Sequence, residues 1–365
     1  MRALSLSAGP KALSLLHAHG PRADQVRAIP AAAGGPKGLI LGPLDRFVFG
    51  RWLCGTSHPV DLIGASVGAW RMATACLHEP AQALAKLEHD YIHQDYAAEP
   101  GRKRPSPARV SEAFAQSLAG FYQGRVAELL AHPRWHLHIV TSRGRGLLGR
   151  EHPLATPLGY ALAFAANAVH RQGLSLCLQR VMFSVPASLA AGASALRLDD
   201  FPGVQVALTE ANFADALRAS CSIPFLLQSV PDIAGAPRGS YWDGGITDYH
   251  LHLDYRGYGA GAGGGLVLYP HFQRAVVPGW LDKGLRWRHR ATPFLDSMLL
   301  LSPRADWVAS LPNGKLPDRH DFIAYAHDVS TRIRIWRQAA SAAEQLADEF
   351  AQWLERPDLS QVQPL

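Results

Sequence analysis

The chain has 365 residues, of which 48% are hydrophobic and 18% are charged. A chain of this length and composition can bury a full hydrophobic core without disulfides, which excludes a disordered protein and a small disulfide-stapled scaffold. The formal net charge of +6 is mild for this size and spread along the sequence, so we expect no nucleic-acid partner.

Membrane-spanning segments are not predicted. The longest stretch without a charge, from His152 to His170, is interrupted by two prolines and a glycine. Its uninterrupted helical part has about a dozen residues, which is too short to cross a bilayer. The N-terminal segment lacks the long apolar run of a signal peptide. Four widely separated cysteines predict buried free thiols of a reducing compartment. We therefore expect a cytoplasmic protein with at most peripheral membrane contact; the cysteines are Cys54, Cys76, Cys177 and Cys221.

Short apolar strands alternate with helices, a pattern typical of a largely parallel sheet covered on both faces. The first two strands are predicted at 26–33 and 60–63, and each runs through a glycine-rich turn into a helix. The helices after these turns are predicted at 39–49 and 70–77, and two more follow at 82–91 and 108–130. Later strands are predicted at 136–141, 180–185, 204–208, 240–242, 265–269 and 298–301.

The last predicted element is one long helix from Thr331 to Leu354, with Ser330 or Thr331 as its N-cap. Apolar residues recur along it at intervals of three and four, and such a stripe more often packs on the protein's own core than on a partner. No linker divides the sequence, so we expect residues 1–365 to form a single domain. The stripe consists of Ile333, Trp336, Ala340, Ala343, Ala347, Phe350 and Leu354.

A candidate nucleophile lies in the sequence Gly64-Ala65-Ser66-Val67-Gly68, between a predicted strand and a predicted helix. A serine at such a sharp turn has a strained backbone, and the flanking glycines allow neighbouring chains to approach closely. The N-terminus of the following helix directs its dipole at the serine and at a developing oxyanion. A GxSxG sequence also arises by chance in roughly one of a few chains of this size, so a plain glycine turn is the alternative.

A second glycine-rich turn follows the first strand, with Gly34, Gly35, Pro36, Lys37 and Gly38. Backbone N–H groups at such a strand-to-helix turn can bind an anion, although Pro36 contributes none. The spacing differs from a Walker A loop, and no Ser or Thr follows the lysine. A phosphate cradle, an oxyanion hole and a plain helix start all fit this turn.

The third motif is Asp243-Gly244-Gly245, directly after the predicted strand 240–242. Asp-Gly is ordinary turn chemistry, so this motif carries weight only together with the other two. Ser66, Asp243 and the turn at 34–38 all follow predicted strands, and open α/β sheets build their sites at the carboxyl ends of strands. A nucleophile needs a base within hydrogen-bond reach and donors directed at the oxyanion, and these motifs supply all three.

The motifs resemble the signatures of the patatin-like phospholipases, which are a GGGx[KR]G turn, a GxSxG nucleophile and a DG[GA] aspartate in this order. Residues 217–225 (LRASCSIPF) also resemble the Ala-Ser-x-x-x-Pro block that precedes the aspartate in that family. The resemblance extends from about Val26 to Tyr249, and residues 250–365 are expected to complete the domain. One departure is Ala33, which stands where many members have the first glycine.

The resemblance implies a three-layer α/β/α patatin-like fold and a lipid acyl hydrolase with a Ser66–Asp243 dyad. Asp243 would accept the proton of Ser66, and Ser66 would attack an ester carbonyl to form an acyl-enzyme. N–H groups around Gly34, Gly35 and Val67 would hold the oxyanion. The implied substrate is a lipid or another acyl ester, and the reaction requires no cofactor and no metal. Because an ordinary aspartate has a pKa of about 3.9, partial desolvation of the carboxylate is also expected.

Three other interpretations stay open. An α/β-hydrolase triad has candidate histidines downstream, but Ser66 follows only the second predicted strand, whereas that family places its nucleophile later. An acyltransferase would use the same dyad, and a lipid-binding regulator would keep the fold without turnover. His250 and His252 alternate as HxH without a third metal ligand at a typical spacing, so satisfied or surface histidines are expected. The candidate triad histidines are His250, His252, His271, His289, His320 and His327.

One basic stretch also carries two tryptophans. Lys283, Arg286, Arg288 and Arg290 alternate with Trp280 and Trp287, a combination that suits the surface of an anionic membrane. The alternative is a solvated basic face with both tryptophans turned inward.

Overall fold

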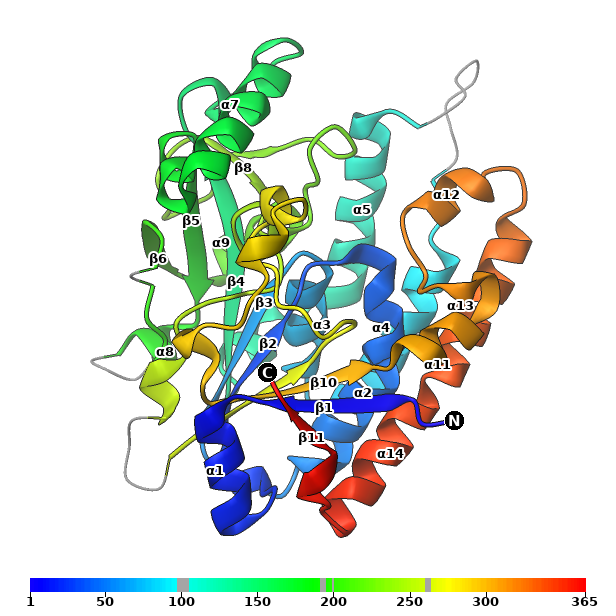
Figure 1. The fold of residues 1–365 in the computed structure, drawn as a ribbon. Helices are drawn as coiled ribbons and strands as arrows, with labels where there is room; N and C mark the ends of the chain where they lie inside the picture. The colour runs from blue at the N-terminus through cyan, green and yellow to red at the C-terminus, as the bar shows by residue number, and fades with distance from the viewer. Residues whose placement is uncertain (97–104, 191–194, 199, 260–263) are drawn as a thin grey trace.

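The computed structural model describes residues 1–96, 105–190, 195–198, 200–259 and 264–365. Its centre is one sheet with the strand order β11-β1-β10-β9-β2-β3-β4-β5-β6, and β7 and β8 branch from β4. Most neighbouring strands are parallel, and helices lie on both sides of the sheet (Figure 1). The predicted three-layer α/β/α architecture is confirmed.

The strands are β1 (Leu4–Ala8), β2 (Val26–Ala31), β3 (Val60–Ala65), β4 (Trp135–Gly144), β5 (Leu178–Ser184), β6 (Gly203–Ala207), β7 (Val230–Pro231), β8 (Ser240–Asp243), β9 (Leu266–Pro270), β10 (Met298–Pro303) and β11 (Val362–Pro364). The helices are α1 (Pro10–His19), α2 (Gly42–Phe47), α3 (Val67–Ala75), α4 (Pro80–His93), α5 (Pro107–Tyr122), α6 (Val126–Leu130), α7 (Ala155–Val169), α8 (Pro186–Leu189), α9 (Glu210–Ser220), α10 (Gly245–Asp248), α11 (Ala305–Ser310), α12 (His320–Ala324), α13 (Val329–Ala342) and α14 (Glu344–Glu355). The 3₁₀ helices include η2 (Gly35–Leu41), which follows β2, and η4 (Gly146–Leu148) and η5 (Arg171–Leu176), which lie on either side of α7 in the sequence.

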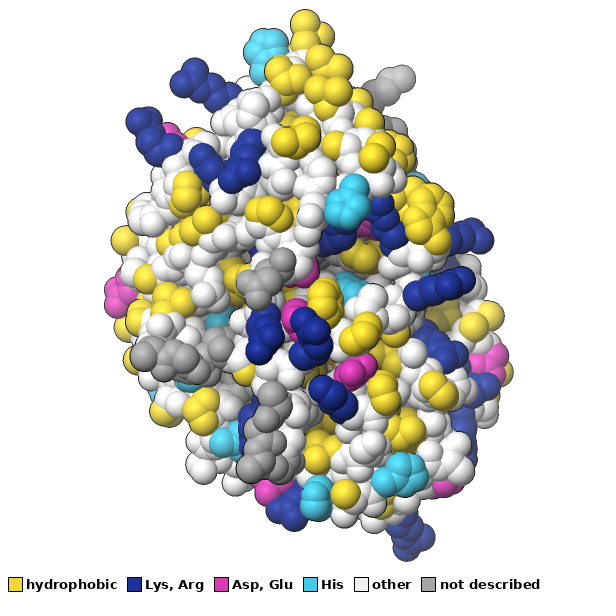
Figure 2. Space-filling model, turned by 60° about the vertical axis from the view of Figure 1, so that its left-hand side comes forward, with side chains coloured by type: hydrophobic (Ala, Val, Ile, Leu, Met, Phe, Trp, Pro, Cys, Tyr) yellow, Lys and Arg dark blue, Asp and Glu magenta, His cyan; other side chains and the backbone are white. Residues whose placement is uncertain are grey.

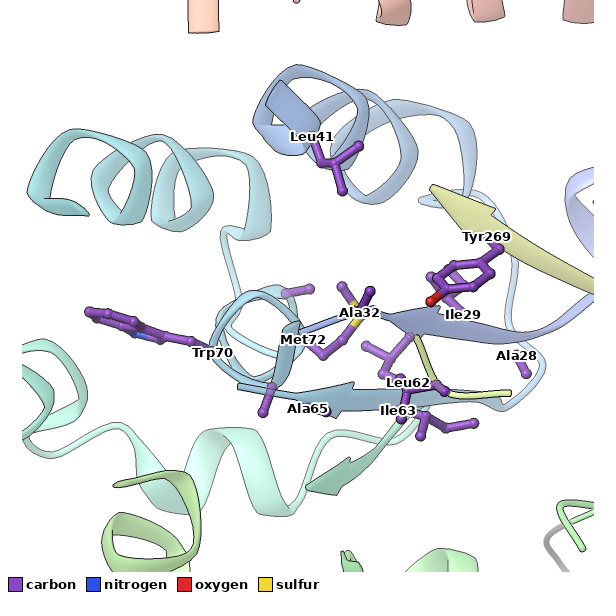
Figure 3. Close-up of a cluster of buried hydrophobic side chains, with 14 of the residues drawn as sticks. Ala28, Ile29, Ala32, Leu41, Leu62, Ile63, Ala65, Trp70, Met72 and Tyr269 are labelled. Carbon is purple, nitrogen blue, oxygen red and sulfur yellow. The ribbon is translucent and has the colours of Figure 1, made fainter. Parts of the chain in front are cut away.

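The hydrophobic core lies between the central strands and the helices that follow them. All six residues of β3 are buried, and so is every residue of α3. Figure 3 shows Met72 of α3 reaching toward β2 near Ala32, with Leu41 above it and Leu62 and Ile63 on β3 below. A strand buried on both faces reads as a continuous apolar run, which is why the sequence predicts β2 and β3 well.

The strands β3 and β8 meet end to end along β4. Strand β3 pairs with β4 in parallel up to Ala65↔Val140, and β8 pairs with β4 antiparallel from Thr141↔Asp243 onward. The two strands therefore point at each other, and their carboxyl ends meet at adjacent residues of β4. The expectation that Asp243 ends a strand is confirmed, but that strand runs opposite to its neighbours.

Several predicted boundaries differ from the structure. The region predicted as one helix at 108–130 is broken between α5 and α6, where Gly124 has φ 71°. The helix predicted at 39–49 begins earlier, as η2. The C-terminal helix is divided into α13 and α14 at Ala343, and its N-cap is Asp328, whose carboxylate accepts the N–H of Thr331.

The apolar stripe of this C-terminal region packs inward. Trp336, Ala343 and Phe350 are fully buried, and α14 contacts both α2 and β1. The expectation that the stripe docks on the protein's own core is confirmed. In Figure 1, α13 and α14 run along the side of the molecule opposite α1.

The cysteines partly depart from the expected burial. Cys76 and Cys221 are buried, but Cys177 is half-buried and Cys54 is exposed, and all four are free thiols. In the part of the chain that the structure describes, no helix is both long enough and apolar enough to cross a membrane.

Candidate active site

The side chains of Ser66 and Asp243 are in direct contact. Ser66 Oγ donates a hydrogen bond of 2.7 Å to Asp243 Oδ2, although 177 positions separate the two residues in the chain. Both are almost completely buried, with 3% and 5% of their surfaces exposed. The meeting of β3 with β8 explains this contact, because it brings the two strand ends together. A hydroxyl bonded to a carboxylate in a largely dry site is the arrangement that nucleophilic catalysis requires.

The backbone at Ser66 is strained in the way that a nucleophile turn predicts. Its φ of 56° and ψ of −130° belong to a region that residues other than glycine rarely adopt. Ser66 is the N-cap of α3, so the positive end of the helix dipole points toward its hydroxyl. Val67 opens the helix, and the first N–H groups of a helix have no acceptor within it. The N–H of Val67 is therefore suited to an oxyanion.

Close packing explains the motif glycines. A methyl group at Gly68 would overlap the carbonyl oxygen of Ala31 on β2, and one at Gly244 would overlap that of Val140 on β4. Gly64 lies within β3, and a methyl group there would overlap the backbone of Ala69. The glycines therefore allow the nucleophile turn and the aspartate turn to pack directly against the backbone of the neighbouring strands.

Ser220, at the end of α9, fixes both halves of the dyad to β4. Its Oγ accepts the N–H of Ser66 at 2.9 Å and donates to the carbonyl of Val140 at 2.7 Å. Its carbonyl accepts the N–H of Gly244 at 3.1 Å. Two residues after Ser220, the carbonyl of Ser222 accepts the N–H of Asp243 at 2.9 Å. The block at 217–225 thus positions the nucleophile and the base together.

The glycine-rich turn at 34–38 lies against the nucleophile turn. Gly35 has φ 57° and opens η2, so this turn presents helix-start N–H groups. A methyl group at Gly38 would come within 3.3 Å of the Val67 side chain. Gly35, Gly38 and Val67 also line the same narrow cavity of about 30 Å³. The structure therefore brings together the three elements that the sequence motifs contain.

The departure at Ala33 has a structural counterpart in Gly245. A methyl group on Gly245 would lie only 2.6 Å from the Ala33 methyl group, which is too close for both to be present. The N–H of Ala33 donates to the carbonyl of Tyr249 at 2.9 Å, which ties the turn to the segment after α10. Alanine thus fits this position because Gly245, which opens α10, leaves space for it.

Burial makes Asp243 a stronger base than an ordinary aspartate. Desolvation raises the pKa of its carboxyl group, and this outweighs the lowering by Arg319, by the Ser66 hydroxyl and by the N–H of Gly245. Gly245 N–H donates to Asp243 Oδ1 at 2.7 Å, which leaves Oδ2 for the serine. A carboxylate with a raised pKa accepts a proton more readily than an ordinary aspartate does.

Two cations at the site come from parts of the sequence that resemble nothing recognisable. Lys283 Nζ lies 4.0 Å above the centre of the Tyr249 ring, and Tyr249 is within 3.4 Å of where a methyl group on Gly245 would lie. Arg319 Nε approaches the backbone of Gly35, at 3.2 Å from the position of a methyl group there. Sequence reasoning missed both as site residues; Lys283 stood out only as part of a basic stretch.

The third cation, Lys37, was predicted as part of the turn. Its Nζ lies 5.2 Å from the centre of the Phe272 ring, and Phe272 packs against Gly34. Desolvation, followed by Arg319 and Lys315, lowers the pKa of Lys37 against the opposing effect of Asp318. Lys37 therefore contributes its charge to the rim of the site, in addition to the backbone of the turn.

The histidines belong to other networks. His250 is fully buried, its Nδ1 accepts the N–H of Val277 at 3.0 Å, and desolvation lowers its pKa well below the usual value. His252 Nε2 lies 3.4 Å from Thr292 Oγ1. Among the described residues, no histidine hydrogen-bonds to Ser66 or Asp243, and no three potential ligands gather as a metal site would require. Desolvation also lowers the pKa of His252, so both histidines of the HxH pair are buried and neutral, but the expectation of satisfied histidines is wrong for His250, whose Nε2 has no hydrogen-bond partner among the described residues.

A broad apolar surface surrounds α7. We call it the α7 surface; its central residues Leu158 and Leu162 are 55% and 50% exposed. Beneath it the Tyr160 ring contacts Phe225 and Trp242 at 5.8 and 5.9 Å, and Trp242 directly precedes Asp243. Figure 2 shows hydrophobic side chains gathered at the upper end of the molecule, where α7 lies in Figure 1. The surface comprises Leu147, Leu154, Leu158, Leu162, Phe164, Val169, Leu176, Phe225 and Leu226.

A wide groove lies away from the dyad. It has a volume of about 720 Å³ and is lined by polar groups that include Arg150, Glu151 and Arg238. Its described lining includes neither dyad residue and no part of the turn at 34–38. Geometry around the buried serine, and not groove size, therefore identifies the candidate site.

Comparison with known proteins gives no independent assignment. The chain matches no family model, and no curated protein matches it. The resemblance to the patatin-like phospholipases therefore depends on the sequence motifs alone.

Proposed function

We propose that this chain is a serine hydrolase that cleaves carboxylic esters of lipids through the Ser66–Asp243 dyad. The observation that carries the proposal is the 2.7 Å hydrogen bond from Ser66 Oγ to Asp243 Oδ2, at a strained turn beside a donor-rich turn. Asp243 accepts the Ser66 proton while Oγ attacks the carbonyl carbon. N–H groups of Val67 and of the turn at 34–38 stabilise the oxyanion.

The reaction then proceeds in two halves. The tetrahedral intermediate expels the alcohol, which takes the proton from Asp243, and the acyl group stays on Ser66. Water next loses a proton to Asp243 and attacks the acyl-enzyme. The bond to Ser66 Oγ breaks, Oγ regains the proton, and the fatty acid leaves. Each half uses the same carboxylate as acceptor and then donor.

The α7 surface supports a lipid substrate over a water-soluble ester. Contiguous apolar patches of this kind mark binding sites on most soluble proteins, and this one continues through Tyr160 to the residue before Asp243. Exposed arginines flank it, among them Arg150 and Arg238, which suits an anionic membrane. Trp287, 64% exposed, offers a second contact for the interface beside its basic neighbours.

Labelling with a fluorophosphonate tests the nucleophile. We expect one modified residue, Ser66, and no labelling of Ser66→Ala, with hydrolysis of a fluorogenic lipid ester lost in parallel. Ser14→Ala, which changes an exposed serine on α1, serves as the matched control and should label and turn over normally. A Ser66→Ala protein that folds and keeps its activity would refute the proposal.

Acyl transfer uses the same acyl-enzyme with an alcohol in place of water. A labelled acyl donor supplied with lysolipid and glycerol separates the two reactions. We expect the label in free fatty acid; label chiefly in a new ester would assign transfer instead.

A further inference from the structure

We propose that Lys37, Lys283 and Arg319 form a subsite for a negatively charged group, a phosphate or a carboxylate, that the substrate carries close to its scissile ester. This inference rests on the proposed hydrolysis and adds a substrate class: net-anionic acyl esters in preference to neutral or zwitterionic ones.

The three cations come from three separate segments of the chain, and the charges of Arg319 and Lys283 act on Asp243. Lys37 is on η2 and packs on Phe272, behind the turn at 34–38. Lys283 approaches from the segment after Trp280 and lies over Tyr249, which neighbours the aspartate turn. Arg319 precedes α12 and lies against Gly35. The charges of Arg319 and Lys37 in turn act on Lys283, so the three cations lie in one neighbourhood.

Their charges are not neutralised within the described part of the chain. No carboxylate there forms an ion pair within 4.0 Å of any of the three. Two carboxylates act on these cations electrostatically but are engaged elsewhere: Asp243 binds Ser66 and Gly245, and Asp318 forms an ion pair with Lys315 at 2.8 Å. By contrast, the buried Arg71 pairs with Asp45, and the buried Arg180 pairs with Asp200 and Asp248. Unpaired positive charges in one place favour an anion.

Mutual repulsion supports this interpretation. Desolvation, followed by the charges of Arg319 and Lys37, lowers the pKa of Lys283 to about 7. The Lys283 side chain is exposed overall, but its ammonium group lies 4.0 Å from the centre of the Tyr249 ring and 5.5 Å from that of the Trp280 ring. A bound anion would relieve the repulsion and restore the usual protonation of this lysine.

A matched pair of substrates tests the subsite. We would compare an octanoyl monoester of glycerol with the same ester bearing a phosphate on the glycerol, both below their aggregation limits. Charge-assisted contacts are about twice as strong as neutral ones, so Lys283→Met and Arg319→Met should each lower the phosphate-to-neutral ratio of kcat/KM by about tenfold. Lys283→Arg should retain the ratio, and Lys11→Met, on an exposed lysine of α1, is the control.

Equal loss of activity on both esters would overturn the proposal, because it would show that the cations act only through the ionisation of Asp243. An unchanged ratio in both variants would overturn it as well.

Binding to the Ser66→Ala protein separates this failure from a failure of the proposed hydrolysis. The probes are octyl phosphate, octanol and inorganic phosphate. We expect octyl phosphate to bind more tightly than either of the others and to weaken about tenfold in Ser66→Ala/Lys283→Met. Equal binding of octyl phosphate and octanol would refute the subsite. If inorganic phosphate bound as tightly as octyl phosphate, the cations would be a site for a free ion, and the proposal that the substrate carries the negative charge would be refuted.

Discussion

The strain at Ser66 can be measured by replacing it with glycine. Residues other than glycine in this region of backbone space cost about 1–3 kcal/mol, and glycine adopts it freely. Ser66→Ala and Ser66→Gly both lose the hydrogen bond to Asp243, so the step between them isolates the backbone. That step also removes one buried methyl group, about 0.8 kcal/mol, and loosens the unfolded chain, about 0.4–1 kcal/mol.

A matched alanine gives the reference value. Ala73 is fully buried in α3, seven residues from Ser66, and has an ordinary helical backbone. There the same change should destabilise the protein by about 1–2 kcal/mol, with no strain to release. At position 66 the strain offsets the loss, so Ser66→Gly should lie within about 1 kcal/mol of Ser66→Ala.

Urea denaturation of Ser66→Ala, Ser66→Gly, Ala73→Gly and the unaltered protein provides the assay, with the midpoint compared at constant slope. The alanine-to-glycine step should cost about 1–3 kcal/mol less at position 66 than at position 73. Equal costs at the two positions would show that the nucleophile turn stores no strain, and the argument from its dihedral angles would fail.

Three further outcomes are expected. Asp243→Asn should lower kcat by about 10²–10⁴-fold. In the unaltered protein, kcat/KM should fall as pH drops through the raised pKa of Asp243, because only the ionised carboxylate accepts a proton. A fall centred at a pH no higher than the pKa of a free aspartate would contradict this. Above a pH of about 7, kcat/KM for anionic esters should fall as Lys283 loses its proton, because desolvation, followed by the charges of Arg319 and Lys37, lowers the pKa of Lys283 to about 7 against the opposing effect of Asp243. Lys283→Arg should abolish this fall. Replacing Leu158 and Leu162 together by serine should reduce co-sedimentation with anionic phosphatidylglycerol vesicles at least tenfold, by loss of about 1.5–3 kcal/mol per buried leucine, while hydrolysis of a soluble short-chain ester persists.

The central strands could be predicted because their chemistry is local. Runs such as Val60–Ile63 are apolar and end at glycines, which marks both the strand and the turn after it. Strand β11 escaped prediction because it has only three residues, at the sheet edge, and depends on pairing with β1: Leu6 pairs with Val362 across almost the full chain. The break at Ala343 contains no glycine or proline, so the sequence carries no sign of it.

The candidate site shows the same division. Ser66 and Asp243 lie in motifs whose glycines are needed for close packing, so their positions in the chain reveal them. The direction of β8 was not readable, because a short strand has the same pattern whichever way it runs. Lys283 and Arg319 lie in irregular segments where no periodicity marks a charge as functional, and only the folded chain brings them to the dyad.

The two residues of the dyad lie on opposite sides of the loop between β7 and β8 in the chain, although the meeting of β3 and β8 along β4 brings them together in space. The N–H of Asp232 donates a hydrogen bond of 2.9 Å to the carbonyl of Gly239 and closes the loop between β7 and β8, so the residues between them lie outside the sheet. A polypeptide cleaved in this loop would carry its hydroxyl on one fragment and its carboxylate on the other. Neither fragment alone could form the acyl-enzyme. Recovered hydrolysis would therefore show that the two fragments had reassociated with β3 and β8 correctly paired along β4.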